Sequence, residues 1–394
     1  MTPGARLQAA IDLLDAIIAA AREGGAAADT LIARYFAERR YAGSKDRRAV
    51  RDLVYAAVRR FGEIPPSGRA AMVALADEDS DIAALFDGTA HAPMPVDPAE
   101  PRAEASRVPA WLEARLAASG LGASEIASLI DRAPLDLRAN ILRTSVEEAM
   151  QLFDEVRPVN GVPDALRLPT GSVVDQTPAW RDGLVEIQDA GSQMVTAAAR
   201  AEPGMAVIDL CAGAGGKSLA LAAAMGNQGA ILASDVDRNR LSRLAPRAER
   251  AGATIIETRL LDGNREADAL TDWHDRADVV LIDAPCSGTG TWRRNPEARW
   301  RLTPARVARL VETQTRLADL GATLVKPGGV LVYIVCSLLD EEGAGQVDRF
   351  LAARPGWTAG DPIPQGRPRG QGKRLTPAHD ATDGFFVARL IRPC

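Results

Sequence analysis

The sequence has few of the residues that most often build metal centres and hydrolytic active sites. It holds three histidines and four cysteines in 394 residues. The cysteines show no CxxC spacing and stand at Cys211, Cys286, Cys336 and Cys394. This scarcity argues against a zinc site and against Ser-His-Asp or Cys-His catalysis. The histidines lie in polar or proline-rich stretches, so we expect them at the surface, and we expect the thiols to be free.

Long hydrophobic runs and targeting signals are also missing. No stretch of about 18 residues or more is free of charged side chains, so no membrane span is predicted. Asp12 and Asp15 interrupt the apolar run near the N-terminus, which argues against a signal peptide. We therefore expect a cytoplasmic protein, and nothing in the sequence predicts a metal cofactor.

Basic residues gather in three places although the net charge is −5. The segments are 34–60, 292–301 and a loop at 367–374 that is rich in glycine and proline. Each alone is typical of a solvated face, but three in an acidic protein favour contacts with phosphate groups. Tyr41, Trp292 and Trp300 lie among these basic residues, where each either stacks on nucleic-acid bases or packs in a core.

The spacing of apolar residues predicts three domains. Helical periodicity runs through residues 6–60, with Ser44 as the expected cap of a third helix, and further helices are expected at 69–76 and 110–133. This indicates an all-helical domain over residues 1–130. Strands near 133–143, 165–168 and 184–187 and a helix over 145–157 predict a small α+β module over residues 131–188.

Residues 189–394 alternate between apolar strands and helices. The expected strands lie at 205–210, 230–235, 254–258, 279–283 and 328–336, with a long helix over 304–325. Apolar strands without polar interruptions predict a parallel sheet that helices cover on both faces. We therefore expect a doubly wound, Rossmann-like α/β domain.

The segment DLCAGAGGKS, residues 209–218, follows the first of these strands, where open α/β sheets bind ligands. A P-loop would need a glycine where Cys211 stands, and a GxGxxG fingerprint would need one where Ser218 stands. The loop therefore favours a cofactor without phosphates. Asp235 and Asp262 follow the next two strands and could bind ribose hydroxyls and an adenine amino group. S-adenosylmethionine has these parts and no phosphate.

Two cysteines leave neighbouring apolar strands. Cys286 follows Asp283 in LIDAPCSGTG, and Cys336 ends the strand in VLVYIVCS. In a doubly wound sheet the ends of these strands can flank one crevice. Free cysteine is also a common buried residue, so a packing role for either thiol stays open at this point.

Methylation of carbon 5 of cytosine is a reaction that uses two thiols. A thiolate that adds to carbon 6 makes carbon 5 nucleophilic, and a second thiol can assist release of the product. Positive charge near the attacking sulfur favours the thiolate, and Lys217 is a candidate source. Asp283 could hydrogen-bond the protonated ring and stabilise the adduct.

Several segments resemble the RsmB/Nop/Sun family of RNA (cytosine-5) methyltransferases. They are QDAGSQ, DLCAGAGGKS, LIDAPCSGTG, RRNPEARW, YIVCSLLDEE and TDGFFVARLIR. RYAGSKDRRAVRDLVYAAVRRFG resembles the NusB-like RNA-binding domain of RsmB proteins, and APLDLRANILR resembles the start of the family's small RNA-binding module. The resemblance covers nearly the whole chain. It implies a NusB-like domain at 1–130, an RNA-binding module at 131–188 and a catalytic domain at 189–394.

The resemblance also implies roles for individual residues. Cys336 would be the nucleophile and Cys286 the helper in product release, with Asp283 and Lys217 beside them. The implied cofactor-binding residues are Cys211, Ala212, Gly213, Ala214, Gly215, Gly216, Lys217, Asp235, Asp262 and Asp283. The sequence departs from the family pattern where Gly213 and Ala214 replace Ala-Pro, where Val335 replaces Thr, and where Gly343 stands in place of Asn. No departure removes a thiol or an acid.

These patterns together predict an S-adenosylmethionine-dependent RNA (cytosine-5) methyltransferase. The family architecture points to 16S ribosomal RNA and therefore to rRNA processing, and we expect a monomer. Transfer RNA as the substrate, or a non-catalytic RNA-binding ribosome-assembly factor, are the alternatives. Methylation of an amino group is disfavoured, because Asp-Ala-Pro-Cys stands where that chemistry would use Asn-Pro-Pro-Tyr.

Overall fold

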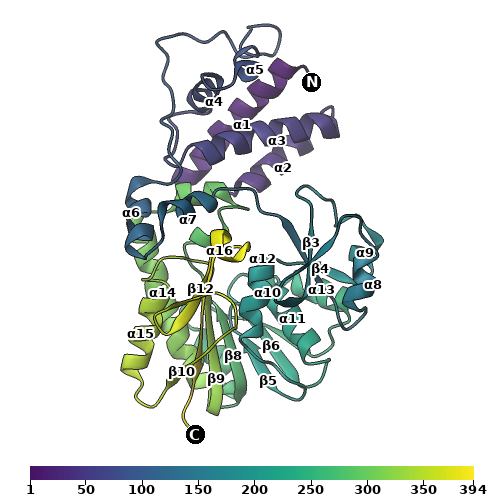
Figure 1. The fold of residues 1–394 in the computed structure, drawn as a ribbon, viewed down its shortest axis with the longest axis vertical. Coiled ribbons are helices and arrows are strands. Elements are labelled where there is room, and N and C mark those ends of the chain that lie inside the picture. Colours follow the sequence, from purple (N-terminus) through teal and green to yellow (C-terminus); the bar gives the residue numbers. More distant parts are fainter. The chain divides into compact units, whose positions relative to one another are not determined.

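The computed structural model describes residues 1–394 and divides into two compact units (Figure 1). The first unit comprises residues 1–131 and 292–303, and the second comprises residues 132–291 and 304–394. The boundary expected at residue 188 has no counterpart in this division, and the three functional domains stay a prediction. No helix combines the length and the apolar surface that a membrane crossing needs.

The first unit is helical, as expected for its sequence. Its helices are α1 (Pro3–Glu23), α2 (Ala28–Glu38), α3 (Ser44–Arg60), α4 (Gly68–Ala76), α5 (Ser80–Ala83), α6 (Ala110–Ala118) and α7 (Ala123–Ser128). Gly43, not Ser44, caps α3, because the Asp46 carboxylate accepts the Gly43 N–H at 3.2 Å. The helical structure expected over 110–133 is present as two helices, because Gly120 adopts a left-handed conformation and separates α6 from α7.

A second stretch of chain completes the core of this helical unit. Trp292 and Trp300 in residues 292–303 are buried, and Trp300 Nε1 donates to the carbonyl of Phe61 at 2.9 Å. The stretch contains a 3₁₀ helix, Pro296–Arg301. Arg299 in this helix is fully buried and donates to backbone carbonyls at the end of α3. The expectation that residues 292–301 offer a phosphate-binding face is therefore wrong for Arg299. Trp292 and Trp300 pack in the core, which is one of the two roles expected for them.

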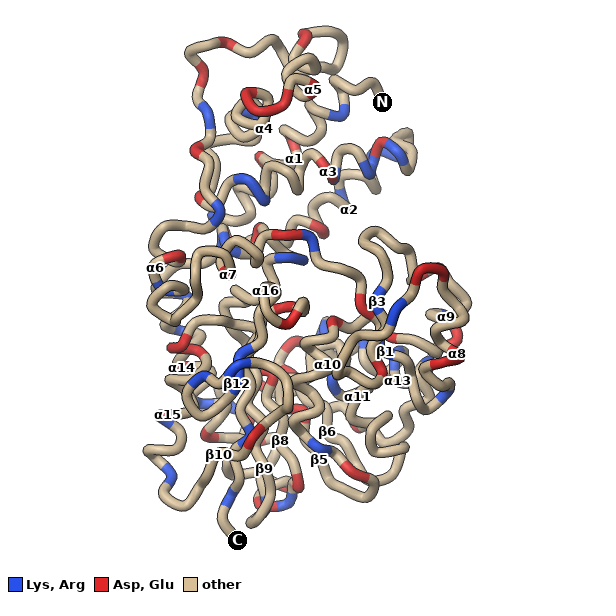
Figure 2. The backbone as a smooth tube through the Cα atoms, viewed as in Figure 1, with Lys and Arg blue, Asp and Glu red and all other residues tan.

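Tyr41 has a different environment from the two tryptophans. Its side chain is 74% exposed, and it lies just before α3. Lys45, Arg47 and Arg48 in the first turns of α3 are also exposed. Figure 2 shows this basic segment at the start of α3, with acidic residues interspersed along the same unit.

A small antiparallel sheet opens the second unit. Its strand order is β2 (Arg157–Val159), β3 (Val162–Leu168), β1 (Leu135–Ala139) and β4 (Val185–Ile187). Two short helices accompany it, α8 (Val146–Met150) and α9 (Pro178–Arg181). The helix expected over 145–157 is shorter than predicted, because Phe153 and Val156 turn into the core of this sheet and the chain continues as β2.

The main sheet of the second unit is mixed. Its order is β7 (Ile256–Leu260), β6 (Ala230–Asp235), β5 (Ala206–Asp209), β8 (Ala277–Asp283), β9 (Val325–Val335), β13 (Phe385–Ile391), β12 (Gly372–Leu375) and β11 (Arg367–Arg369), and β10 (Thr358–Gly360) also pairs with β13. The strands from β7 to β9 are parallel, whereas β13 runs antiparallel to β9. The all-parallel expectation is wrong for this edge, where β10, β11, β12 and β13 form only antiparallel pairs.

Helices cover both faces of the main sheet (Figure 1). One face packs against α10 (Ala190–Ala197), α11 (Gly216–Ala224), α12 (Arg238–Leu241) and α13 (Leu244–Ala251), and the other against α14 (Pro304–Leu324) and α15 (Ala344–Ala353). Val207 and Leu281 belong to the first core, and their neighbours Ile208 and Ile282 belong to the second. The parallel pairing of β5, β6, β8 and β9 places their carboxyl ends at one edge of the sheet.

The basic segment at 367–374 is the β11–β12 hairpin and not a loop. Its Arg369 and Arg374 both pair with Asp340, which follows β9. These two guanidinium groups therefore brace the chain after β9 instead of standing free for phosphate.

Candidate active site

The glycine-rich loop after β5 needs its glycines. Gly213 and Gly215 have φ angles of +57° and +84°, and Gly215 caps α11. A Cβ atom on Gly213 would stand 2.3 Å from Arg240 Nη2. Asp235 at the end of β6 accepts the Gly213 N–H at 2.7 Å and, through its other oxygen, the Asp237 N–H at 2.7 Å. The loop is thereby fastened to the end of the neighbouring strand.

Asp209, the last residue of β5, is fully buried beneath this loop. Ser218 Oγ donates to its Oδ2 at 2.7 Å, and its Oδ1 has no partner. Burial raises the pKa of Asp209 to about 7, against the lowering effects of Ser218 and Lys217.

Lys217 and Asp283 form an ion pair at the ends of α11 and β8. Lys217 Nζ donates to Asp283 Oδ2 at 2.7 Å. Burial lowers the pKa of Lys217, but the charge and hydrogen bond of Asp283, together with the charges of Asp209 and Cys336, outweigh burial, and the pKa is raised. Lys217 therefore carries its positive charge next to both Asp283 and the thiol of Cys336.

The two thiols expected to converge do so. Cys286 Sγ lies 3.4 Å from Cys336 Sγ, within hydrogen-bonding distance for sulfur. Their strands β8 and β9 are neighbours in the sheet, and each cysteine follows the end of its strand. The hydrogen bond with Cys336 raises the pKa of Cys286 well above its ordinary value, and burial adds to the effect.

An open cavity of about 490 Å³ adjoins the thiols. Its walls are formed by Leu210, Cys211, Asp235, Val236, Asp237, Arg240, Leu261, Gly263, Glu266, Asp283, Ala284, Pro285, Cys286, Thr313, Arg316, Leu317 and Cys336. A groove of about 170 Å³ adjoins it and shares Cys211, Arg240 and Asp283. The other residues of the groove are Gln188, Ser192, Asp209, Ala212, Ala214, Gly216 and Lys217.

Most of the residues expected at the site line these two cavities. Gly213 and Gly215 shape the loop without lining either one. Asp262 is exposed and lines neither, although Leu261 and Gly263 beside it do. Cys211 lines both cavities, and burial raises the pKa of its thiol well above its ordinary value.

Sequence reasoning missed several residues of the site. Arg240 lines both cavities, and Thr313 and Arg316 reach the larger one from α14. Arg316 forms an ion pair with the buried Glu266. The amphipathic pattern of α14 contains no signal that marks these two positions, whereas Arg240 stands just after the acid-bearing strand β6 and could have been considered.

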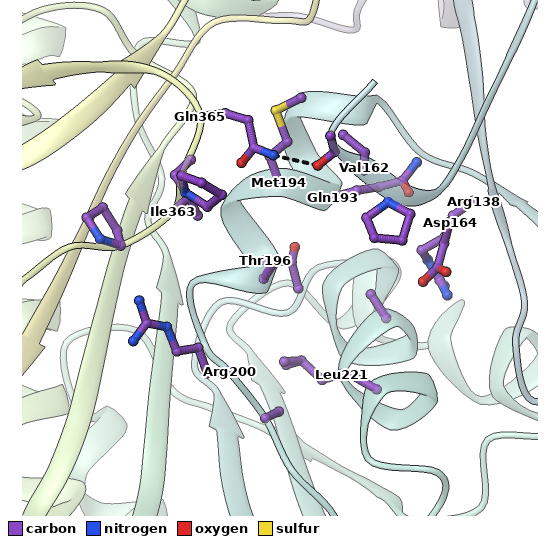
Figure 3. Close-up of a pocket in the computed structure, with 18 residues that line it drawn as sticks. Arg138, Val162, Asp164, Gln193, Met194, Thr196, Arg200, Leu221, Ile363 and Gln365 are labelled. Carbon is purple, nitrogen blue, oxygen red and sulfur yellow. Dashed lines mark hydrogen bonds between the residues drawn. The ribbon is translucent and has the colours of Figure 1, made fainter. Parts of the chain in front are cut away.

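A second large cavity lies elsewhere in the same unit (Figure 3). It has a volume of about 470 Å³ between the small sheet, α10, α11 and the loop at 362–365. Val162, Met194 and Leu221 form part of its apolar wall, and Gln365 donates to the carbonyl of Gly161 across it. It shares no lining residue with the cavities beside the thiols.

Comparisons with known proteins agree with this geometry. The family model for 16S rRNA methyltransferase RsmB/F matches residues 197–391. A ribosomal RNA small subunit methyltransferase B from Xylella fastidiosa is 35% identical over 293 residues, which cover 72% of this chain and 68% of that protein. The chain belongs to the RsmB/F methyltransferase family.

Other RsmB/F relatives match over a smaller part of their length. A probable ribosomal RNA small subunit methyltransferase B from Synechocystis is 38% identical over 269 residues, which cover 65% of this chain and 59% of that protein. The match thus spans about three fifths of several curated relatives. The solved structure of PH0851 shares the fold, with a TM-score of 0.78, 23% identity and coverage of 99% of both chains.

Proposed function

We propose that the protein transfers a methyl group from S-adenosylmethionine to carbon 5 of a cytosine in 16S ribosomal RNA. The observation that carries the proposal is the pair of sulfur atoms 3.4 Å apart at one cavity, beside an acid and a lysine. Two convergent thiols are what covalent activation of a cytosine and release of the product require.

S-adenosylmethionine fits the residues of the groove and cavity. Carboxylates of Asp209, Asp235 and Asp283 line them, which suits a ligand with a positive sulfonium and a positive amino group. The Asp235 oxygens bind backbone N–H groups and keep further lone pairs for ribose hydroxyls. Asp262 would act from the rim of the cavity. When bound, this cofactor supplies an electrophilic methyl group.

Cys336 is the proposed nucleophile. Its sulfur adds to carbon 6 of the cytosine and forms a covalent adduct, close to the ion pair of Lys217 and Asp283. Lys217 holds one Asp283 oxygen, so the other can accept a hydrogen bond from the ring nitrogen of the base. Protonation at that nitrogen balances the electron density that the incoming sulfur brings.

Cys286 is the proposed helper in product release. While Cys336 carries charge, it raises the pKa of Cys286 through a hydrogen bond and through electrostatic repulsion. Once the Cys336 sulfur is bonded to carbon 6, it carries no charge and both causes weaken. Cys286 can then lose its proton more readily and take the proton from carbon 5, after which the bond between carbon 6 and Cys336 breaks.

The proposal that the substrate is 16S ribosomal RNA rests on the family and on the names of the relatives. The first unit, proposed to be NusB-like, would bind RNA through the exposed Tyr41 and the basic start of α3. The target cytosine must leave its stack to reach the cavity. We propose that the protein acts in the cytoplasm as a monomer.

Bisulfite sequencing of RNA from strains with and without the gene tests this proposal. One cytosine of 16S rRNA should lose its methylation in the deletion strain and regain it with the wild-type gene. A Cys336→Ser gene should fail to restore it, whereas Cys394→Ser, which changes an exposed thiol, should restore it. If the deletion strain loses methylation in transfer RNA instead, transfer RNA is the substrate and not 16S rRNA. If no RNA changes its methylation, the alternative of a non-catalytic assembly factor is favoured.

A further inference from the structure

Glu342 is a fully buried carboxylate behind the two thiols. Its Oε1 accepts the Ser287 N–H at 2.8 Å and Gln314 Nε2 at 3.0 Å. Its Oε2 accepts the hydroxyls of Ser287 and Ser337. Four neutral donors from three segments of chain therefore converge on one side chain, and Glu342 itself does not line the cavity.

The two serines give these contacts their importance. Ser287 follows Cys286, and Ser337 follows Cys336, so each serine is the residue next to one of the thiols. The two hydroxyls lie 3.0 Å apart, and both bind the same carboxylate oxygen. The turn after β8 and the turn after β9 are thus joined through Glu342.

Glu342 is itself held in place by the fold. Tyr333 in β9 donates its hydroxyl to the backbone carbonyl of Glu342 at 2.7 Å. Gln314 in α14, which binds Glu342, also donates to the carbonyl of Pro285 at 2.9 Å. The carboxylate is therefore an anchor fixed by a strand and by a helix, and the thiol-bearing turns attach to it.

We propose that Glu342 is a positioning residue that fastens the two thiol-bearing turns to each other and so keeps both sulfur atoms at one point of the cavity wall. The importance of this for catalysis rests on the proposed function, because only a reaction that uses both thiols needs them together. A carboxylate suits the task, since its two oxygens act only as acceptors and can receive all four donors. A glutamine would offer one oxygen and would turn a donor toward groups that already donate.

Binding of phenylarsine oxide measures the sulfur-to-sulfur geometry without RNA or cofactor. Trivalent arsenic condenses with two thiols, forming two As–S bonds and releasing one water, only where both sulfurs can reach it. Wild-type protein should bind the arsenical tightly, and Cys336→Ala should set the level for a single thiol. Glu342→Gln should weaken binding, and Glu342→Ala should weaken it by about tenfold to a hundredfold, as for misplacement of a reacting group by roughly 1 Å.

The matched control is Glu312→Gln, the same change at an exposed glutamate of α14, which should bind the arsenical like the wild type. In the Glu342 variants S-adenosylmethionine binding should persist, and kcat for methylation should fall with little change in KM for RNA. Wild-type arsenical affinity in folded Glu342→Ala would overturn the inference. Equal loss of arsenical and cofactor binding in Glu342→Gln would also overturn it, by showing general collapse. If the wild-type protein methylates no RNA and the Glu342 variants still bind the arsenical more weakly than the wild type does, the positioning role is upheld and the proposed function is refuted.

Discussion

Single side chains of the active site owe their chemistry to burial next to a few charged groups. Lys217 keeps its charge because Asp283 stands beside it, and Cys286 keeps its proton because Cys336 is close. Asp209 is the opposite case, because it is buried with one oxygen unpaired and its pKa rises to about 7. Each of these groups would titrate in its ordinary range if it were exposed.

Asp209→Asn should change the dependence of stability on pH. A folded-state pKa of about 7 means that the folded protein holds a proton that the unfolded chain loses near pH 4. The stabilisation is full below the unfolded pKa and is lost as pH rises to 7, so the wild type should lose stability over this range. The asparagine variant lacks this loss and should be more stable at pH 8 by roughly 2–4 kcal/mol.

Urea unfolding at about pH 3, pH 5.5 and pH 8 checks this prediction, because these values lie below, between and above the unfolded and folded pKa values of Asp209. The difference between variant and wild type should grow with pH and nearly vanish at the lowest value. Parallel pH profiles for the two proteins would show that the pKa of Asp209 does not differ between the folded and unfolded states, and would contradict the prediction.

At the scale of the elements, the loop between β5 and α11 depends on conformations that other residues avoid. Gly215 lies in the left-handed region, and a Cβ there would stand 2.4 Å from Leu244 Cγ. Gly216, the first residue of α11, has nothing within 4 Å of its Cβ position. Gly215 is therefore required by its backbone conformation and by Leu244, whereas no atom of the protein crowds a side chain at Gly216.

Gly215→Ala should therefore disrupt the loop, whereas Gly216→Ala should not. The first change should destabilise the protein by about 1–3 kcal/mol and weaken S-adenosylmethionine binding, because the backbone is strained and Leu244 must move. The second should leave the melting temperature unchanged. Calorimetry measures cofactor binding by both variants, and thermal unfolding measures their stability. Unaltered cofactor binding in Gly215→Ala would refute the proposed role of Gly215 in the loop.

The sequence predicts those elements whose residues repeat a pattern within one segment. The strands β5, β6 and β8 are apolar runs that each end in an aspartate, and β9 is an apolar run that ends just before Cys336, so all four can be located from the sequence. The antiparallel strand β13 was not foreseen, because its alternation resembles that of any strand and its partner is chosen by tertiary pairing. Thr313 and Arg316 were missed for a similar reason, since only the packing of α14 on the sheet brings them to the cavity.

At the scale of the whole molecule, residues 292–303 show that chain order and structural units differ. These residues stand between β8 and α14 in the sequence, yet they pack within the helical unit. Their basic composition suggested a nucleic-acid surface, but Arg299 is fully buried and burial lowers its pKa to about 9. Composition alone cannot separate a basic surface from an arginine that caps a helix, because both place a cation near oxygen atoms.

Arg299→Met should loosen the helical unit and leave the second unit unchanged. Removal of the guanidinium leaves the carbonyls of Val58 and Arg59 at the end of α3 without this donor, at a cost of about 2–4 kcal/mol, whereas the Phe61 carbonyl keeps its hydrogen bond from Trp300. Hydrogen exchange should accelerate in α3 and stay constant in β5 and β6. Arg309→Met, at an exposed position of α14, is the control and should alter neither region. Unchanged exchange in α3 would contradict the capping role.

Trapping of RNA by the two single thiol variants tests the central claim most directly. Purified Cys286→Ala and Cys336→Ala are each incubated with 16S rRNA and S-adenosylmethionine and run on a denaturing gel with and without ribonuclease. The account predicts a ribonuclease-sensitive covalent complex with Cys286→Ala, and neither complex nor methylation with Cys336→Ala. Normal turnover by Cys336→Ala, or a covalent complex formed by that variant, would contradict it.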